Sequence, residues 1–226
     1  MKILAIIPCY NEALNLKRTV DQLRETAPEV DFIVVDDGSR DSTGQVCADN
    51  GFPVIVLPFN LGLANAVQTG MRYARIKGYD MALQFDGDGQ HKPEYIRDMV
   101  RLMAESSADI VVGSRYAHTK PRGLRGFGGK LLGAAIRIAT GQSLSDPTSG
   151  MRLYNRDMIG RFADHMNYGP EPDTLAYLLK QGAVILETPV VMAERTAGQS
   201  YLNALSAANY MLRMFVSIII IHWFRI

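Results

Sequence analysis

Two aspartates separated by a glycine form the group in this sequence that is best suited to bind a metal ion. Asp86 and Asp88 follow the apolar run 81–85, and Gln90 comes two residues later. Two carboxylates at the end of a strand can turn toward one point, and such oxygen ligands suit Mg²⁺ or Mn²⁺ rather than zinc. A divalent cation held there would neutralise a diphosphate. The competing interpretation is a solvated acidic turn, since Asp and Gly are ordinary turn residues.

A second acidic turn lies earlier in the chain, at residues 36–43. Asp41 or Ser42 could cap the helix that follows, which accounts for only part of the turn. Asp37 could accept hydrogen bonds from ribose hydroxyls or a base. The first predicted strand is not followed by Gly-x-Gly-x-x-Gly, and the sequence has no Walker motif, so dinucleotide and P-loop binding lose their physical basis. We therefore expect phosphates to be held by a metal ion and by side chains.

The segments that must position these residues alternate between apolar strands and amphipathic helices. Runs rich in Ile, Val, Leu and Phe predict strands at 2–7, 31–35, 53–57, 79–85 and 109–113. Apolar residues at helical spacing predict covering helices at 13–26, 41–50, 62–77 and 93–106. This alternation predicts an α/β fold with a mostly parallel central sheet flanked by helices.

Polar motifs come directly after four of the predicted strands, at residues 8–12, 36–39, 86–88 and 113–115. In an open α/β sheet, ligands bind beyond the carboxyl ends of the strands. The motifs are therefore expected to meet at one edge of the sheet and to form a single site.

Composition narrows the class of protein. The chain has 226 residues, of which 47% are hydrophobic, enough for one domain with a large core. A formal net charge of +1 provides no long-range field for nucleic acid, so we expect no nucleic-acid partner. Cys9 and Cys47 are too few for a disulfide framework and too isolated for a zinc site, which favours a reducing compartment. Pro8 interrupts the first apolar run, so no export signal is expected.

Seven motifs in order along the chain carry a family resemblance: PCYNE, VVDDGSRDST, NLGLANAVQTG, FDGDGQH, VVGSRY, DPTSGMRLYNR and ERTAGQSYL. They resemble the family 2 glycosyltransferases, particularly the polyprenyl-phosphate sugar transferases and related cell-surface polysaccharide enzymes. The resemblance covers nearly the whole chain. It implies a GT-A fold, with residues 1–200 as the transferase domain. It also implies inverting transfer of a sugar from a UDP-, GDP- or dTDP-linked donor, with Mg²⁺ or Mn²⁺.

The resemblance assigns roles by motif. The residues matched to nucleotide contacts are Pro8, Tyr10, Glu12, Asp37 and Asp86. The residues matched to the metal and the donor diphosphate are Asp86, Asp88 and Gln90. Glu12 has an alternative role as a carboxylate that interacts favourably with a helix dipole.

An inverting transfer needs a base for an acceptor hydroxyl, or no base if the acceptor is already a phosphate anion. Asp146 matches the family's acidic residue across from the metal and is, with Asp88, the leading catalytic candidate, either as base or for positioning the acceptor. Its alternative is a turn aspartate before proline. Glu171 and Asp173 rank second, because carboxylates at a helix start, here 170–180, are common for dipole reasons alone.

Five polar residues are expected to bind phosphate groups or the acceptor. Arg115 lies in the motif VVGSRY, Arg195 and Ser200 lie in ERTAGQSYL, and Arg122 and Arg125 lie between motifs. Segment 116–129, with four glycines, is predicted to be a mobile loop that could act as a lid, the alternative being a solvated basic loop. Gln199 stands where many polyprenyl-phosphate enzymes carry lysine, so a neutral hydroxyl on a growing lipid-linked glycan stays open as the acceptor.

The C-terminal segment 201–226 is predicted to be one helix that begins amphipathic and ends apolar. Its apolar run 214–224 is shorter than the roughly 20 residues that span a bilayer, so contact with a membrane surface is expected instead. Trp223 and Arg225 would be interfacial anchors. A helix docked on the core and a homodimer interface are the alternatives. The expected location is cytoplasmic, on the inner face of the cytoplasmic membrane.

Two other functions remain open at the level of sequence. A sugar-phosphate nucleotidyltransferase uses a related sheet but places a Gly-rich cationic loop after the first strand, where this chain has Tyr10-Asn11-Glu12. A non-catalytic scaffold of a membrane glycan assembly complex would be expected to show damage to the metal site, whereas Asp86, Asp88 and Gln90 are all present.

Overall fold

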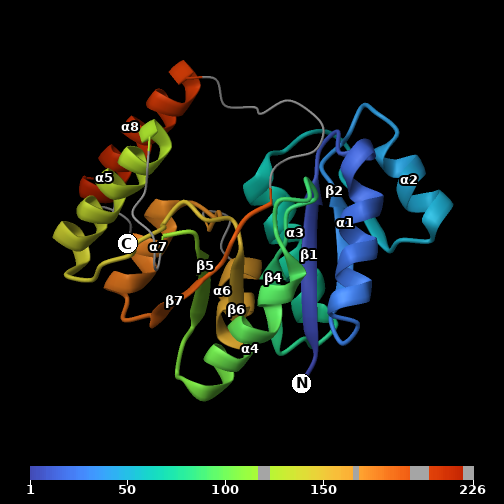
Figure 1. Cartoon of the computed structure of the whole chain (residues 1–226), viewed down its shortest axis with the longest axis horizontal. Coiled ribbons are helices and arrows are strands. Elements are labelled where there is room, and N and C mark those ends of the chain that lie inside the picture. Colours follow the sequence, from blue (N-terminus) through green and yellow to red (C-terminus); the bar gives the residue numbers. More distant parts are fainter. Residues whose placement is uncertain (117–122, 165–167, 194–203, 221–226) are drawn as a thin grey trace.

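The structure is a computed structural model, and it describes residues 1–116, 123–164, 168–193 and 204–220, with residues 123–127 and 204–208 described by their backbone alone. The described residues form a seven-stranded sheet covered by helices on both faces (Figure 1). The strands are β1 (Ile3–Cys9), β2 (Asp31–Asp36), β3 (Val54–Val56), β4 (Met81–Gln84), β5 (Ile110–Ser114), β6 (Arg152–Asn155) and β7 (Ile185–Pro189). The predicted α/β class is confirmed.

The strand order is β3-β2-β1-β4-β6-β5-β7. All neighbouring pairs are parallel except those of β6, which runs antiparallel to both β4 and β5. In the register, Cys9 of β1 lies beside Asp36 of β2, so the two polar turns that follow these strands are adjacent. Because β6 is antiparallel, the loop that leads into it lies at the edge where β4 and β5 end.

The helices divide the sheet between two hydrophobic cores, because side chains of successive strand residues point to opposite faces. In β1, Leu4 and Ile6 face one core, whereas Ile3, Ala5 and Ile7 face the other. The first core is covered by α3 (Leu63–Ile76), α5 (Gly123–Thr140), α6 (Arg156–Asp164), α7 (Pro172–Lys180) and α8 (Ala204–Ile219). The second is covered by α1 (Ala13–Thr26), α2 (Thr43–Asn50) and α4 (Ile96–Glu105), with the 3₁₀ turn η1 (Pro93–Tyr95) before α4.

The prediction of a loop at 116–129 is wrong for its second half, because α5 begins at Gly123. The glycines that weakened the helical pattern allow close packing. A Cβ at Gly128 would lie 2.4 Å from the terminal methyl of Met211 in α8, and one at Gly133 would lie 2.6 Å from the carbonyl oxygen of Leu144. Without side chains at these positions, α8 and the chain after α5 can approach the α5 backbone closely.

The C-terminal helix packs on the first core through one face. Ile218 is fully buried, and Met211, Met214 and Phe215 are partly buried against α5 and α7. This face therefore matches the alternative of a helix docked on the core. Residues 201–203 and 221–226, including Trp223 and Arg225, lie outside the described part of the chain. Among the described residues, no helix combines the length and the apolarity that crossing a bilayer requires.

Candidate active site

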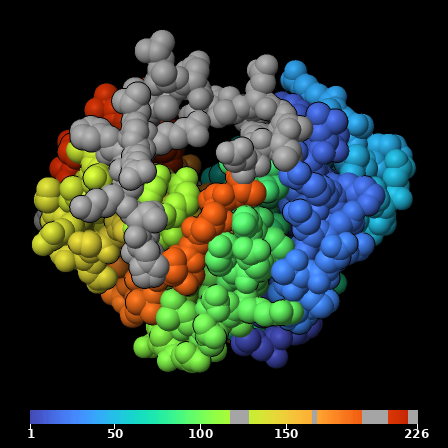
Figure 2. All heavy atoms as spheres, viewed as in Figure 1, coloured from blue at the N-terminus to red at the C-terminus, as the bar shows by residue number. Residues whose placement is uncertain are grey.

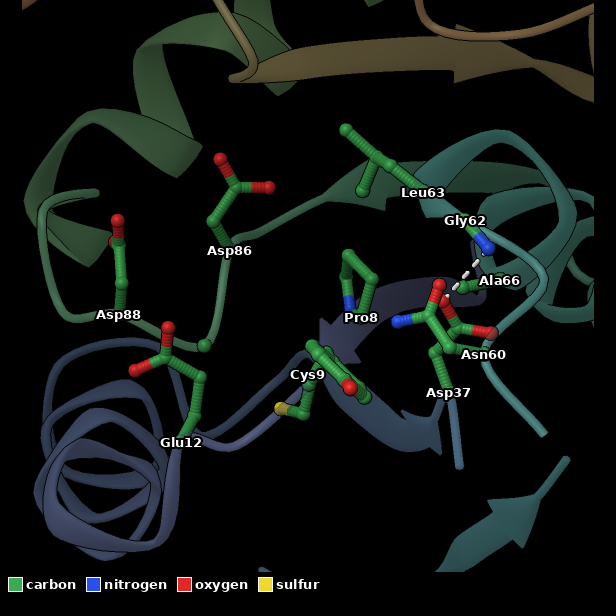
Figure 3. A pocket seen from close by; sticks show the side chains of 12 residues that line it. Pro8, Cys9, Glu12, Asp37, Asn60, Gly62, Leu63, Ala66, Asp86 and Asp88 are labelled. Atoms are coloured by element: carbon green, nitrogen blue, oxygen red, sulfur yellow. Dashed lines mark hydrogen bonds between the residues drawn. The ribbon is translucent and has the colours of Figure 1, made fainter. Parts of the chain in front are cut away.

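A cavity of about 670 Å³ opens at the carboxyl ends of β1, β2 and β4. It is lined by Pro8, Cys9, Tyr10, Glu12, Asp37, Asn60, Gly62, Leu63, Ala66, Asp86, Gly87 and Asp88. Asp86 and Asp88 project to the same side of the turn that joins them, and Asp37 lies across the pocket with Pro8 between (Figure 3). The cavity therefore brings together residues from both acidic turns and from the turn after β1.

The turn after β1 is tied to the second acidic turn by hydrogen bonds. Asn11 has a positive φ of 57°, and its side-chain oxygen accepts a hydrogen bond of 2.8 Å from the backbone N–H of Arg40. The backbone N–H of Asn11 donates to Ser39 Oγ, and that of Glu12 donates to Thr43 Oγ1. An asparagine adopts the left-handed conformation more readily than most residues and can be held there by such local bonds. These hydrogen bonds hold the turn after β1 and the second acidic turn in fixed positions relative to each other.

Asp37 holds the loop that forms the other wall of the cavity. Its two carboxylate oxygens accept hydrogen bonds of 2.8 Å from the backbone N–H groups of Leu61 and Gly62. Gly38, with φ of 68°, lies so close to this loop that a Cβ would fall 2.5 Å from the carbonyl carbon of Phe59. Asp37 is 3% exposed and still lines the cavity. It therefore both lines the cavity and fixes the position of the loop around Asn60.

The Asp86 carboxylate is oriented by three neighbours. Gln84 Nε2 donates to Asp86 Oδ1 at 3.1 Å, and the Asp86 backbone N–H donates to His91 Nδ1 at 2.9 Å. With Nδ1 accepting, the proton of a neutral His91 ring belongs on Nε2, which lies 3.6 Å from Asp86 Oδ2. On the remaining side is Gly150, where a Cβ would fall 2.8 Å from Oδ2. The side chain thus has little freedom to turn away from the cavity.

The donor set suits a cation that is shared with a ligand. Asp86 and Asp88 are half-buried, and Asp88 Oδ1 accepts the backbone N–H of Gln90 at 3.0 Å. Within the described residues, no three His, Cys, Asp or Glu side chains gather closely enough to hold a metal ion by themselves. Mg²⁺ is commonly bound by one or two carboxylates together with substrate phosphates, rather than by a cage made of protein alone. Two carboxylates that project to the same side of a turn beside a cavity fit that pattern.

Cys9 lines the same cavity but is not suited to act as a nucleophile. Its thiol is 2% exposed, and burial, with the nearby Cys47 and acidic groups, raises its pKa well above the ordinary value. The thiolate is the reactive form of cysteine, so a thiol with a raised pKa stays inert.

Asp146 is fully buried and pairs with Arg115. Arg115 Nε donates to Asp146 Oδ2 and Nη2 donates to Oδ1, both at 2.7 Å, and the Arg115 backbone N–H also donates to Oδ2. This hydrogen bonding raises the pKa of the Arg115 guanidinium. Both oxygens of Asp146 therefore face a cation, whereas the side chain of Arg115 is one-third exposed, at 34%.

The second pair of acidic candidates contacts α8. Tyr210 donates to Glu171 Oε2, and Ser217 Oγ donates to Asp173 Oδ2 at 2.7 Å. Burial, together with Glu171, raises the pKa of the Tyr210 phenol. These contacts give the two carboxylates a role in attaching α8 to the start of α7.

Several residues expected at the site cannot be placed. Arg122, Arg195, Ser200 and the side chain of Arg125 lie outside the described part of the chain. Two other residues that shape the site were not predicted from the sequence, although Gly150 lies within the DPTSGMRLYNR motif. Glu187 and Gly150 act through contacts that only the folded chain brings about.

Comparison with known proteins identifies a family whose model matches most of the chain. Residues 4–162 match the model of the family described as Glycosyl transferase family 2. The undecaprenyl-phosphate mannosyltransferase of Micrococcus luteus is 32% identical over 219 residues, which cover 90% of this chain and 88% of that protein.

Two solved structures share the fold. Glucosyl-3-phosphoglycerate synthase from Mycobacterium tuberculosis, in complex with Mn²⁺ and UDP-glucose, has a TM-score of 0.70 at 18% identity, covering 96% of this chain and 78% of that one. A mannosyltransferase from Pyrobaculum calidifontis, in complex with GDP-Man and Mn²⁺, has a TM-score of 0.63 at 19% identity, covering 88% of this chain and 58% of that one. The predicted GT-A fold is confirmed by these likenesses.

Proposed function

The chain belongs to glycosyl transferase family 2, and on that premise we propose that it transfers a sugar from a nucleoside-diphosphate donor to the phosphate of a polyprenyl lipid. The transfer inverts the anomeric carbon. An oxygen of the acceptor phosphate forms the new bond to that carbon, and the bond to the donor diphosphate breaks. A nucleoside diphosphate leaves with the bonding electron pair.

One observation carries the proposal: a single cavity holds Asp37 at one end and, at the other, Asp86 and Asp88, whose side chains project to the same side of their turn. Its volume of about 670 Å³ lies in the range of small-molecule sites. A nucleoside would lie toward Pro8, Tyr10 and Asp37, and a diphosphate toward the aspartate pair. The match to a nucleotide-sugar is one of both size and charge.

A divalent cation would be held by Asp86 and Asp88, with Gln90 beside them, and would supply positive charge for the departing diphosphate. We leave Mg²⁺ and Mn²⁺ as the two candidates. Glu12 helps to fix the turn after β1, because its carboxylate accepts a hydrogen bond of 2.8 Å from Asn15 and its N–H is held by Thr43. The nucleotide of the donor is UDP, GDP or dTDP.

A phosphate acceptor agrees with the environment of Asp146. A hydroxyl acceptor needs a base, whereas a phosphate anion can attack without one. Asp146 is 0% exposed, and Arg115 occupies both of its oxygens, which disfavours proton transfer to it. We therefore assign Asp146 to positioning, and we assign Arg115 to the acceptor phosphate, with Arg122, Arg125, Arg195 and Ser200 as further contacts. A neutral glycan acceptor is disfavoured for the same reason.

The outer face of α5 and α8 supports attachment to a membrane surface. These two helices pack side by side (Figure 1) and expose apolar side chains at helical spacing: Leu131 and Ile138 on α5, and Leu212, Val216 and Ile220 at α8 and its end. Neither helix contains Asp or Glu, whereas they carry Arg125, Lys130, Arg137 and Arg213. An apolar, cationic face suits an anionic lipid bilayer. We place the protein on the inner face of the cytoplasmic membrane.

The deciding experiment has two parts. Thermal shifts are measured with UDP-, GDP- and dTDP-sugars, with and without Mn²⁺, since a ligand that binds the native state raises its apparent stability. Transfer is then measured to undecaprenyl phosphate and to a neutral lipid-linked glycan. We expect a metal-dependent shift with one nucleotide and transfer to the phosphate. Transfer to the neutral glycan alone would overturn the proposal of a phosphate acceptor. Metal-dependent donor binding without transfer to any lipid would favour the alternative function, a non-catalytic scaffold.

A further inference from the structure

The loop from Ser145 to Gly150 is held from two sides, by the half-buried Glu187 and the buried Arg152. From β7, the Glu187 carboxylate accepts three hydrogen bonds of 2.8 Å: Oε2 from the backbone N–H and the hydroxyl of Ser145, and Oε1 from the backbone N–H of Asp146. A carboxylate that accepts several N–H and O–H donors makes strong, charge-assisted bonds. Glu187 thereby fixes the backbone at the start of the loop.

From β6, Arg152 braces the end of the same loop. Its guanidinium is 1% exposed and donates through Nε to the carbonyl oxygen of Ser149 and through Nη2 to that of Pro147, each at 2.9 Å. The two side chains hold opposite ends of the loop, Glu187 by accepting from its N–H groups and Arg152 by donating to its carbonyl oxygens. Neither of them lines the donor cavity described above.

The braced backbone presents the Asp146 carboxylate to Arg115. The pair is bidentate, and Thr148 Oγ1 completes it by accepting from Arg115 Nη2 at 2.9 Å and donating to Asp146 Oδ1 at 3.1 Å. The Arg115 side chain stays 34% exposed while it is paired with Asp146, so its guanidinium is within reach of an anion at the surface of the site. The orientation of the guanidinium thus depends on Asp146, and that of Asp146 depends on Glu187.

We propose that Glu187 is a positioning residue for the acceptor. By fixing the Ser145–Asp146 backbone, it holds the Asp146 carboxylate and, through it, the Arg115 guanidinium in the orientation that binds the acceptor phosphate. The inference rests on the proposed function, in which Arg115 contacts that phosphate. β7 is an edge strand and is visible between α4 (green) and α5 (yellow) in Figure 2. The positioning residue therefore lies on a different element from Asp146, in the loop before β6, and from Arg115, directly after β5.

The substitution that tests this is Glu187→Gln, which keeps the size of the side chain. A glutamine has one acceptor oxygen and one NH₂ group, so at least one of the N–H groups of Ser145 and Asp146 must face another donor. We expect the KM for undecaprenyl phosphate to rise about tenfold, the size expected when one charge-assisted hydrogen bond is lost. The KM for the donor and its thermal shift should stay unchanged.

A second readout is independent of catalysis. The Nε–H of Arg115, identified in the ¹⁵N spectrum by its disappearance in Arg115→Lys, should exchange slowly with solvent in the native protein. In Glu187→Gln it should exchange at least about tenfold faster, because the pair with Asp146 opens more often. Ser145→Ala, which removes only the hydroxyl bond to Glu187, should show a smaller change in the same direction, and it serves if Glu187→Gln does not fold.

Glu105→Gln, at the exposed end of α4, is the matched control and should match the wild type in both readouts. A merely structural role would lower the melting temperature of Glu187→Gln without changing the acceptor KM of the folded enzyme or the exchange at Arg115. That result would overturn the inference. If the wild type transfers no sugar to any lipid, the proposed function fails, and the exchange at Arg115 alone decides whether Glu187 positions it.

Discussion

Gly150 lies against the carboxylate of Asp86, so closely that a methyl group in place of its hydrogen would fall 2.8 Å from Oδ2. The same methyl group would lie 3.5 Å from Gln84 Nε2 and 3.5 Å from His91 Cε1, the two side chains that orient Asp86. A contact of 2.8 Å is too short for a carbon and an oxygen that are not bonded. Either the loop or the carboxylate would have to move.

We therefore expect Gly150→Ala to lower kcat/KM by at least about tenfold, since a shift of roughly 1 Å in a catalytic group can cost more than that. Gly160→Ala is the matched control, because Gly160 lies in α6 and a Cβ there meets nothing within 4 Å. It should raise the free energy of unfolding by up to about 1 kcal/mol and leave activity unchanged. Steady-state kinetics and thermal unfolding of both variants check this. Full activity in Gly150→Ala would show that Asp86 need not keep its position.

Asp86→Asn and Asp88→Asn should each abolish the Mn²⁺-dependent part of donor binding. An amide is a weaker and uncharged ligand. Mutation of a residue that only supports a metal ligand costs up to about a hundredfold in activity, so the loss of a direct ligand should cost at least that much. The thermal shift with donor, measured with and without Mn²⁺, separates the loss of metal binding from unfolding. Asp98→Asn, on the exposed face of α4, is the control. Unaltered metal dependence in both site variants would remove the metal from the mechanism.

Asp37→Asn should weaken binding of the nucleoside part of the donor. An asparagine cannot accept from both Leu61 and Gly62, and the loss of such a bond costs about 1–3 kcal/mol. We expect the dissociation constant of the nucleoside diphosphate to rise about tenfold or more, with a lower melting temperature. Calorimetric titration checks the affinity, and Asp49→Asn, on the exposed side of α2, is the control. Native affinity would mean that the wall around Asn60 does not contact the nucleotide.

The sequence predicted the half of the fold that repeats a simple pattern. Strands β1 to β5 and helices α1 to α4 were expected within a few residues of their bounds, because apolar runs and helical spacing alternate there without interruption. The glycines of α5 hid that helix, since their reason is the approach of Met211 and Leu144. Strand β6 carries a buried arginine at its first residue, which is not expected of a core strand.

The site, like the fold, contains residues that the sequence predicted and residues that it did not. Residues that immediately follow strands, such as Asp37, Asp86 and Asp88, were predicted to meet, and they line one cavity. Glu187 was not expected, because its role depends on a loop 41 and 42 residues earlier in the chain. The spacing of apolar residues along the chain indicates which face of a helix or strand a residue occupies. It does not indicate a hydrogen-bond partner that lies so far away in the sequence.

The exposed apolar face of α8 should bind anionic membranes. Replacing Leu212, Val216 and Ile220 together by serine should lower binding to vesicles that contain an anionic lipid by about tenfold or more, because each buried aliphatic side chain contributes on the order of 1.5 kcal/mol. Ile76→Ser, at an apolar residue on α3 that is even more exposed, is the control. Flotation with vesicles measures the bound fraction, and activity toward a short, soluble acceptor should be kept. Equal flotation of all variants would place the membrane contact elsewhere.

Both cysteines should resist alkylation in the native protein. Burial, followed by the effect of Asp36, raises the pKa of Cys47 to about 11, so at pH 8 only about one thiol in a thousand is ionised. Cys9 is shifted in the same direction. We expect iodoacetamide to modify neither residue at pH 8, and to modify both in guanidinium chloride, as measured by mass spectrometry. Labelling of Cys47 should rise only as the pH approaches 11.

The antiparallel course of β6 sets a fixed distance inside the active site. β4 and β5, which are followed by Asp86 and Arg115, are separated by that one strand, so the two strands lie about 10 Å apart, twice the spacing between neighbouring strands. This gap is spanned by hydrogen-bonded backbone and not by a hinge. If the proposed sites are right, the spacing of the strands in the sheet sets the distance between the donor diphosphate and the acceptor phosphate.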